Sequence, residues 1–275
     1  MLRQPIDTAH RLLVQNVNYA NASLVLAASK LFDLPAPPSM HDDVRHEVLR
    51  DHVLKLWITL PTHFGLTGAP LPPRAGAGDH IVAEALFGPA GAPPPNAEQF
   101  ERFLQSESRI AVVLRKIDQC FEAEEAATGK LDPFTSCSGL GAAPLENSLA
   151  QRHLLHPVMR HIAETRGRGP LWRATARIFD AYACLRDRLP LAHCPASDRV
   201  CVPVSQGTCL FEARSETGRV TRFRMVSPDD HLLARGGILD RMLETLPGTK
   251  EGLLPLLLDI LDPSVALEVV SRQKA

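Results

Sequence analysis

Proline limits the length of the regular elements that this chain can form. It makes up 23 of the 275 residues, above the roughly 5% of an average protein. Because proline lacks a backbone N–H and clashes with the preceding turn, prolines gather in loops or cut helices short. The densest stretch of Pro and Gly predicts a loop at about 66–97, interrupted by one short helix.

Composition narrows the class of protein. Hydrophobic residues make up 45% and charged residues 22%, which is typical of a globular chain, and aromatic residues make up only 5%, so Leu, Val, Ile and Ala must build the core. The net charge of −1 gives no basis for non-specific binding to nucleic acid or to an anionic membrane. No apolar run is long enough to span a bilayer, and the N-terminus lacks the pattern of a secretory signal. We therefore expect a cytoplasmic protein whose six cysteines are reduced.

Hydrophobic periodicity predicts a mostly helical chain with a late β region. Helices are expected at 8–32, 42–60, 97–126, 145–165, 170–188 and 236–261. Residues 199–227 instead alternate and are rich in β-formers, with Thr217-Gly218 as a hairpin turn. The fold class is therefore α+β, predominantly helical, in a single domain over residues 1–275.

Histidines and cysteines do not occur at the spacing of a metal site. The set formed by His193, Cys194, Cys201 and Cys209 lacks the closely paired ligands of a zinc knuckle. Arg50 occupies the position at which a zincin that began at His46-Glu47 would need its second histidine. The histidines at 153, 156 and 161 are more typical of surface or core positions than of ligands.

One acidic cluster leaves two interpretations open. Asp229-Asp230-His231 lies between a predicted strand and a predicted helix, which favours a helix cap over a cation site. No phosphate-binding loop, nucleophile elbow or dinucleotide fingerprint occurs in the chain. The residues by themselves thus reveal no evident active site.

The C-terminal part of the chain resembles the large subunit of nickel–iron hydrogenases. Asp262 and Pro263 match the start of the pattern D-P-C-x-x-C-x-x-H of that family. Ser264, Leu267 and Val270 stand where the pattern has its two cysteines and its histidine.

Two further stretches follow the same family in the same order. Thr8, Ala9 and His10 match the end of C-G-x-C-x-T-A-H, with Arg3 and Ile6 at the two cysteines. Residues 212–214 and 218–228 resemble a strand pair that begins E-A-x-R-G and ends P-T-x-W-N, with Arg214 one residue before the position of the family arginine.

A shortened branch of that family is more similar still. Residues 45–66 and 265–269 resemble a helix and a C-terminal V-A-F-E-V segment of hydrogenase-maturation proteins of the HupK/HoxV type. The resemblance implies a reduced large-subunit-like fold. It also implies that the N- and C-terminal motifs meet at one cleft, which places His10 near Ser264.

The missing cysteines decide what the resemblance implies chemically. Nickel and low-spin iron need soft thiolate ligands, and all four ligand positions hold other residues here. The resemblance therefore implies a non-enzymatic maturation factor, a scaffold or escort for the iron–cyanide–carbonyl cofactor or for the immature large subunit. Its partners would be a large-subunit precursor and a small accessory chaperone. The resemblance implies no permanently bound cofactor, and it leaves open whether the protein carries an iron–cyanide–carbonyl group transiently.

The resemblance also nominates candidate residues. His10, Arg214 and Ser264 are the candidate cofactor-binding residues, and we predict no metal ligands and no catalytic residues. If iron binds, Cys137, Cys201 and Cys209 are the thiols that chemistry offers. Two alternatives remain at this point: a pure protein-interaction subunit that never meets the cofactor, and an unrelated α+β enzyme.

Overall fold

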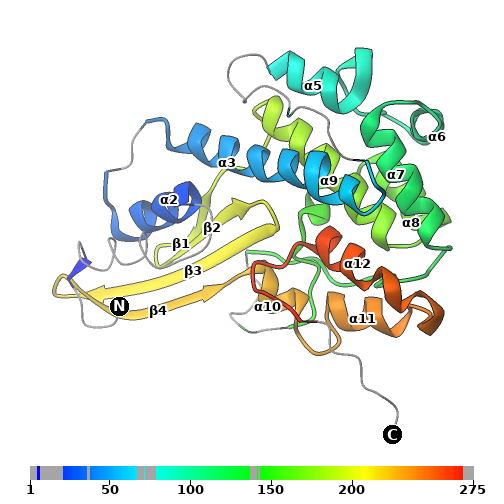
Figure 1. The fold of residues 1–275 in the computed structure, drawn as a ribbon. Helices are drawn as coiled ribbons and strands as arrows, with labels where there is room; N and C mark the ends of the chain where they lie inside the picture. Colours follow the sequence, from blue (N-terminus) through cyan, green and yellow to red (C-terminus); the bar gives the residue numbers. More distant parts are fainter. Residues whose placement is uncertain are drawn as a thin grey trace, which may run out of the picture.

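The computed structural model describes residues 5–6, 21–35, 38–66, 71, 79–136, 141 and 143–268. Over these residues the protein is a mostly helical α+β structure with a four-stranded antiparallel sheet in the order β1-β2-β3-β4 (Figure 1). The α-helices are α2 (Asn21–Phe32), α3 (Met40–Leu54), α4 (Leu60–Thr62), α5 (Asp79–Phe87), α6 (Ala97–Leu104), α7 (Arg109–Cys120), α8 (Pro157–Thr165), α9 (Pro170–Leu185), α10 (Pro228–Leu232), α11 (Ile238–Glu244) and α12 (Leu254–Leu261). A π-helical turn η1 (Lys55–Thr59) and the 3₁₀ turns η2 (Gly88–Ala90), η3 (Leu149–His153) and η4 (Gly248–Leu253) complete the helical part. The strands are β1 (His193–Ala196), β2 (Arg199–Val204), β3 (Gly207–Glu216) and β4 (Arg219–Val226).

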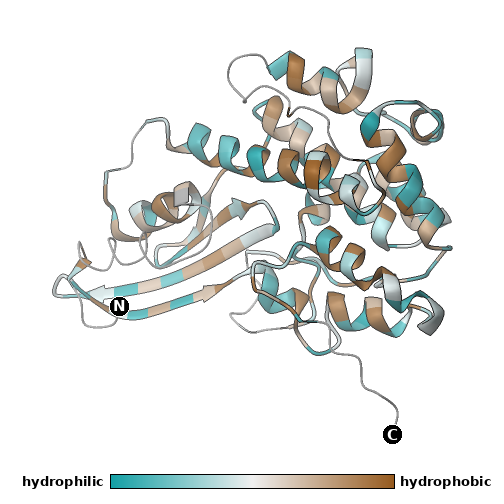
Figure 2. Cartoon of the chain, viewed as in Figure 1, coloured by the Kyte–Doolittle hydropathy of each residue, from teal (hydrophilic) through white to brown (hydrophobic). Residues whose placement is uncertain are grey.

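Helix α9 is the centre of the helical part. It is buried over nearly its whole length, and α3, α5, α7, α8, η3 and α12 all contact it. Hydrophobic and hydrophilic residues alternate along the neighbouring helices (Figure 2), and the buried apolar residues of these helices form one core cluster with those of α9. Three charged residues of α9, namely Arg173, Arg177 and Asp180, are therefore enclosed, and each needs a partner because an unpaired buried charge is costly.

The sheet is formed by consecutive hairpins. Thr217 and Gly218 both have positive φ, 50° and 73°, as a tight hairpin turn between β3 and β4 requires. Helix α2 covers one face of the sheet, where its Ala28 and Phe32 pack with Ala213 and Val220. The predicted hairpin is thus confirmed, whereas strand β1 was not foreseen.

The other predictions differ from the structure mainly where one long helix was expected. The helix predicted at 97–126 is two helices, because Ser108 begins α7 by accepting a hydrogen bond from the N–H of Ala111. Arg115 donates to the carbonyl oxygen of Leu104 at 2.8 Å and so closes the end of α6. The helix predicted at 145–165 begins only at Pro157, and the one predicted at 236–261 is interrupted around Pro247. The first part of the helix predicted at 8–32, up to residue 20, lies outside the described residues.

The helix predicted at 42–60 runs from Met40 to Thr62 and contains the π-helical turn. Pro61 has no N–H to donate to the carbonyl oxygen of Trp57, and Arg109 donates to that oxygen instead at 3.4 Å. The N–H of Leu60 bonds back to Lys55, five residues earlier. Insertions of this kind occur frequently at functional sites, and this one lies beside the cluster described below.

Within the described residues, no helix is both long and apolar enough to cross a bilayer.

Candidate functional site

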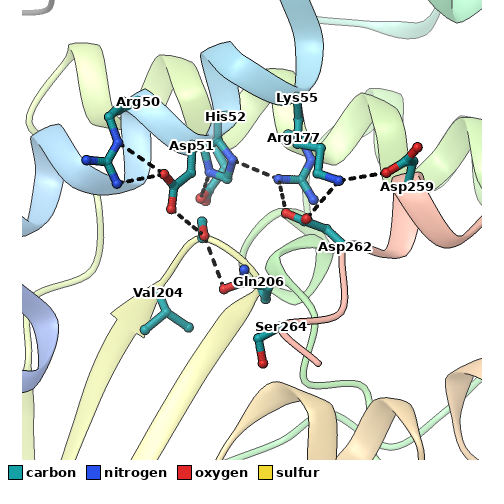
Figure 3. Close-up of polar contacts among 12 residues, drawn as sticks. Arg50, Asp51, His52, Lys55, Arg177, Val204, Gln206, Asp259, Asp262 and Ser264 are labelled. Carbon is teal, nitrogen blue, oxygen red and sulfur yellow. Dashed lines mark hydrogen bonds and ion pairs between the residues drawn. The ribbon is translucent and has the colours of Figure 1, made fainter. Parts of the chain in front are cut away.

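The C-terminal segment that carries the hydrogenase-like pattern is held to the helical part by ion pairs. Helix α12 ends at Leu261, and the next residue, Asp262, has a left-handed backbone (φ 57°, ψ 53°) that turns the chain away from the helix axis. The Asp262 carboxylate lies 2.9 Å from Nζ of Lys55 and 3.2 Å from Nη1 of Arg177 (Figure 3). Lys55 also reaches Asp259 at 3.0 Å, so one lysine holds two carboxylates of the C-terminal region.

Asp180 is the buried centre of the polar network beneath this segment. Its side chain is inaccessible to solvent and lies 2.6 Å from Nη1 of Arg152, 2.8 Å from Nε2 of His52 and 3.0 Å from Nε2 of His153. Burial alone would raise the pKa of Asp180, but the charge of Arg152 and the hydrogen bonds from the two histidines hold it well below its usual value. Asp180 is therefore ionised.

The protonation of His52 follows from its two partners. Arg177 can only donate, so Nδ1 of His52 accepts its hydrogen bond at 3.2 Å and Nε2 donates to Asp180. Burial lowers the pKa of His52, which keeps the ring neutral. A continuous line of contacts thus runs from Asp180 through His52 and Arg177 to Asp262.

The same centre also holds one end of the sheet. Arg152 donates to the carbonyl oxygen of Val204 at 2.8 Å and to that of Gly207. Asp51, beside His52 in α3, accepts a hydrogen bond at 3.2 Å from the hydroxyl of Ser205, in the turn between β2 and β3. The network therefore places the β2–β3 turn and the C-terminal segment on the same side of α3.

Ser264 is fixed by Asp229 of α10. The backbone N–H of Ser264 donates to Oδ2 of Asp229 at 3.0 Å and to Oδ1 at 3.3 Å, and its hydroxyl also donates to Oδ2. Burial raises the pKa of Asp229, although these hydrogen bonds oppose the rise. The position at which the hydrogenase pattern has a metal-bridging cysteine thus holds a hydroxyl that is engaged with a carboxylate.

A small cavity lies between Asp229, the residue that holds Ser264, and helix α9. It has a volume of about 20 Å³, and its polar lining includes Arg173, Arg177, Gln206 and Asp229. That volume holds about one water molecule.

The predicted site residues are not brought together by the described part of the chain. His10 lies outside the described residues, so its expected meeting with Ser264 stays a prediction. Arg214 is exposed on β3, where it donates to Asp198 at 3.0 Å. It lies seven positions along β3 from Gly207, the end of the strand that approaches Pro228, and this corresponds to roughly 23 Å along a strand.

The histidines and cysteines considered as possible ligands do not converge on one point. His153 contacts Asp180, His161 contacts Glu101 at 2.7 Å, and His156 accepts a hydrogen bond from the N–H of Val158 at the start of α8. Cys201 and Cys209 lie on neighbouring strands but belong to hydrophobic clusters on opposite faces of the sheet. Burial raises the pKa of the Cys209 thiol, which opposes the thiolate form that binds metals.

The three residues of the acidic cluster at 229–231 each bind a different part of the chain. Asp230 accepts hydrogen bonds from the N–H and the hydroxyl of Ser227 and so caps α10, the helix that contains it. His231 donates from Nδ1 to the carbonyl oxygen of Ala143 at 2.7 Å. Among the described residues, no group of three or more His, Cys, Asp or Glu side chains is arranged to hold a metal ion.

Comparison with known proteins assigns the chain to a family. No family model matches it. Over 269 residues, which make up 98% of this chain and 87% of the other protein, it is 36% identical to the hydrogenase expression/formation protein HupK of Rhodobacter capsulatus. The chain belongs to the HupK family of hydrogenase expression/formation proteins. The family predicted from residues 45–66 and 265–269 is therefore confirmed.

The sequence interpretation missed the network that underlies this HupK-family site. Arg173, Arg177 and Asp180 recur at helical spacing within an otherwise apolar helix, a pattern that signals enclosed and paired charges. Their partners were not visible in the sequence, because His52 is 128 residues from Asp180 and Asp229 is 35 residues from Ser264.

Proposed function

We propose that this HupK-family protein is a non-catalytic hydrogenase maturation factor that acts as an escort for the immature large subunit. Membership of a hydrogenase expression/formation family supports the maturation role. It also supports a non-catalytic role over that of an unrelated enzyme. A small accessory chaperone and the large-subunit precursor are the proposed partners, and the cytoplasm is the proposed location.

The donor set around Ser264 carries the choice of an escort over a carrier of iron. Its described groups are a hydroxyl, the carboxylates of Asp229 and Asp262, and the cations of Lys55 and Arg177. These are hard or cationic groups, whereas iron with cyanide and carbonyl ligands needs soft thiolates. Among the described residues, the donors therefore do not fit the iron–cyanide–carbonyl group as cargo.

The geometry suggests how a pseudo-subunit could resemble a large subunit without its metals. Ion pairs at Asp262 and hydrogen bonds at Ser264 hold the C-terminal segment in place. These contacts do not require a metal. We take the fold to be a reduced relative of the large subunit. Such a surface would offer accessory proteins the contacts of a large subunit while the real one is completed.

The test is to purify the tagged full-length chain anaerobically from a host that expresses the hydrogenase accessory proteins and the large-subunit precursor. The escort proposal expects the precursor to be retained, with no iron and no cyanide or carbonyl bands in the infrared spectrum. Iron together with those bands would refute the escort role in favour of a cofactor scaffold. Absence of both precursor and bands would refute the maturation proposal itself.

A further inference from the structure

A larger cavity lies between helix α8 and the loop that follows α7, with the start of α9 beneath it. Its volume is about 370 Å³, which falls within the roughly 300–1,000 Å³ of cavities that bind ligands in proteins. It shares no lining residue with the small cavity beside Asp229. We call it the α8 pocket, and it is a candidate binding site separate from the one described above.

The floor of the α8 pocket is apolar. Trp172 at the start of α9 and Met159 of α8 line it, and each is 1% exposed. Nε1 of Trp172 donates to the carbonyl oxygen of Met159 at 3.1 Å, which fixes the indole ring and uses its only donor. Leu154 and Ala163, both half-buried, complete the floor. The floor therefore suits an apolar group rather than a polar one.

Two arginines contact the Trp172 ring, but their partners differ. Cζ of Arg173 lies 5.4 Å from the ring centroid, and this guanidinium pairs with Glu146 at 3.1 Å. Cζ of Arg168, which lines the pocket, lies 5.5 Å from the same ring. Arg168 is half-buried, and within the described part of the chain its guanidinium has no hydrogen bond or ion pair. Its N–H donors are therefore available to a ligand in the pocket.

The rim of the α8 pocket carries charges of both signs. The side chains of Lys130 and Arg160 line it and have no hydrogen bond or ion pair among the described residues. Glu124 and Glu164 also line it, and their carboxylates form no ion pair within the same part of the chain. Together with Arg168, three cations face two carboxylates. The pocket thus has an excess of one positive charge, and its half-buried charge, that of Arg168, is a cation.

We propose that the α8 pocket binds a carboxylate and a neighbouring apolar side chain of a partner polypeptide, and this inference rests on the escort function proposed above. Arg168 would hold the carboxylate, because the guanidinium fork binds carboxylates in a bidentate manner. The apolar side chain would lie on Trp172 and Met159, as an anchor residue fills a pocket at the centre of an interface. The carboxylates of the rim repel a phosphate-rich polyanion, which is therefore the less suitable occupant.

The experiment measures how much co-expressed large-subunit precursor the tagged full-length chain retains, in washes at about 50 and about 300 mM NaCl. Arg168→Met removes the guanidinium but keeps an apolar chain over Trp172, and Arg168→Lys keeps the charge without the fork. Ala163→Phe fills the pocket without changing a charge. Arg186→Met is the matched control, because Arg186 is exposed and also lies over an aromatic ring, 5.7 Å from that of Tyr182, but does not line the α8 pocket. Thermal unfolding of each variant verifies that it is folded.

Arg168→Met and Ala163→Phe should each reduce retention about tenfold at low salt, Arg168→Lys should reduce it less, and Arg186→Met should leave it unchanged. Equal retention by all five proteins would overturn the docking inference and leave the escort function standing. No retention by the unaltered chain would refute the escort function, on which the inference rests. If all five proteins retain the precursor equally, and the fluorescent apolar anion anilinonaphthalene sulfonate binds the unaltered chain but not Arg168→Met, the pocket takes a small anion and the inference is wrong.

Discussion

Replacing Asp180 with Asn tests whether the buried network holds the fold together. The change keeps the shape of the side chain but removes the carboxylate that contacts Arg152, His52 and His153 together. The amide can accept from one of these donors, and its own NH₂ group must then face another donor. Breaking a buried ion pair by removing one partner costs about 3–5 kcal/mol.

The lower end of that range is the better expectation here. Arg152 keeps the carbonyl oxygens of Val204 and Gly207 as acceptors, and its side chain is 8% exposed, so its charge is not wholly stranded. We expect a loss of about 3 kcal/mol in the free energy of unfolding. For a chain of this size that corresponds to a decrease in Tm of roughly 6–12 °C.

Urea unfolding followed by far-UV circular dichroism at neutral pH measures the effect. Asp118→Asn is the matched control, since the Asp118 carboxylate also pairs with an arginine, Nε of Arg166 at 2.9 Å, but is 28% exposed. The control should cost less than about 1 kcal/mol. If Asp180→Asn costs no more than Asp118→Asn, the buried network does not stabilise the fold and the reasoning is wrong.

Three further predictions follow from the same contacts. Burial lowers the pKa of His52, so at mildly acidic pH this histidine binds a proton in the unfolded chain but not in the folded one. The free energy of unfolding should therefore fall as the pH drops below about 6.5. His52→Gln should therefore flatten the dependence of urea midpoint on pH between about 7 and about 5, and an unchanged slope would contradict this assignment. A Cβ at Gly207 would lie 2.0 Å from a backbone carbonyl oxygen, so Gly207→Ala should cost about 3 kcal/mol or more in urea unfolding. Gly252→Ala, which faces open space, should cost less than about 0.5 kcal/mol, and equal losses would argue against the close approach. Arg177→Met removes one of the two cations at Asp262, so hydrogen exchange of the backbone after that residue should speed up, and unchanged exchange would mean that Lys55 suffices.

Local signals in the sequence predicted most of the elements but not their exact lengths. The helix at 170–185 and the hairpin around Thr217-Gly218 follow from short-range periodicity and turn chemistry. The break at Ser108 was missed, because apolar spacing continues across it and only the capping hydrogen bond to Ala111 divides the two helices. Element boundaries of this kind depend on individual hydrogen bonds that periodicity does not show.

The candidate site was predictable only in part. The loss of thiol ligands at Ser264 and Leu267 could be read from residue identity, since ligand chemistry belongs to the side chain itself. The environment of Ser264 could not be read in this way. The sequence favours a helix cap for the cluster 229–231, and Asp230 performs that task, whereas Asp229 holds Ser264 instead.

The sequence alone determined the family, the α+β class and the absence of a soft-ligand set at the hydrogenase-like positions, because each depends on residue type and local order. Only the tertiary structure decided which charges are buried and with what they pair. Asp180 gathers His52 and Arg152 from distant segments, and Arg177 links them to Asp262. The physical reason is that burial removes water from every charged group at once, so each must find its partner in space rather than along the chain.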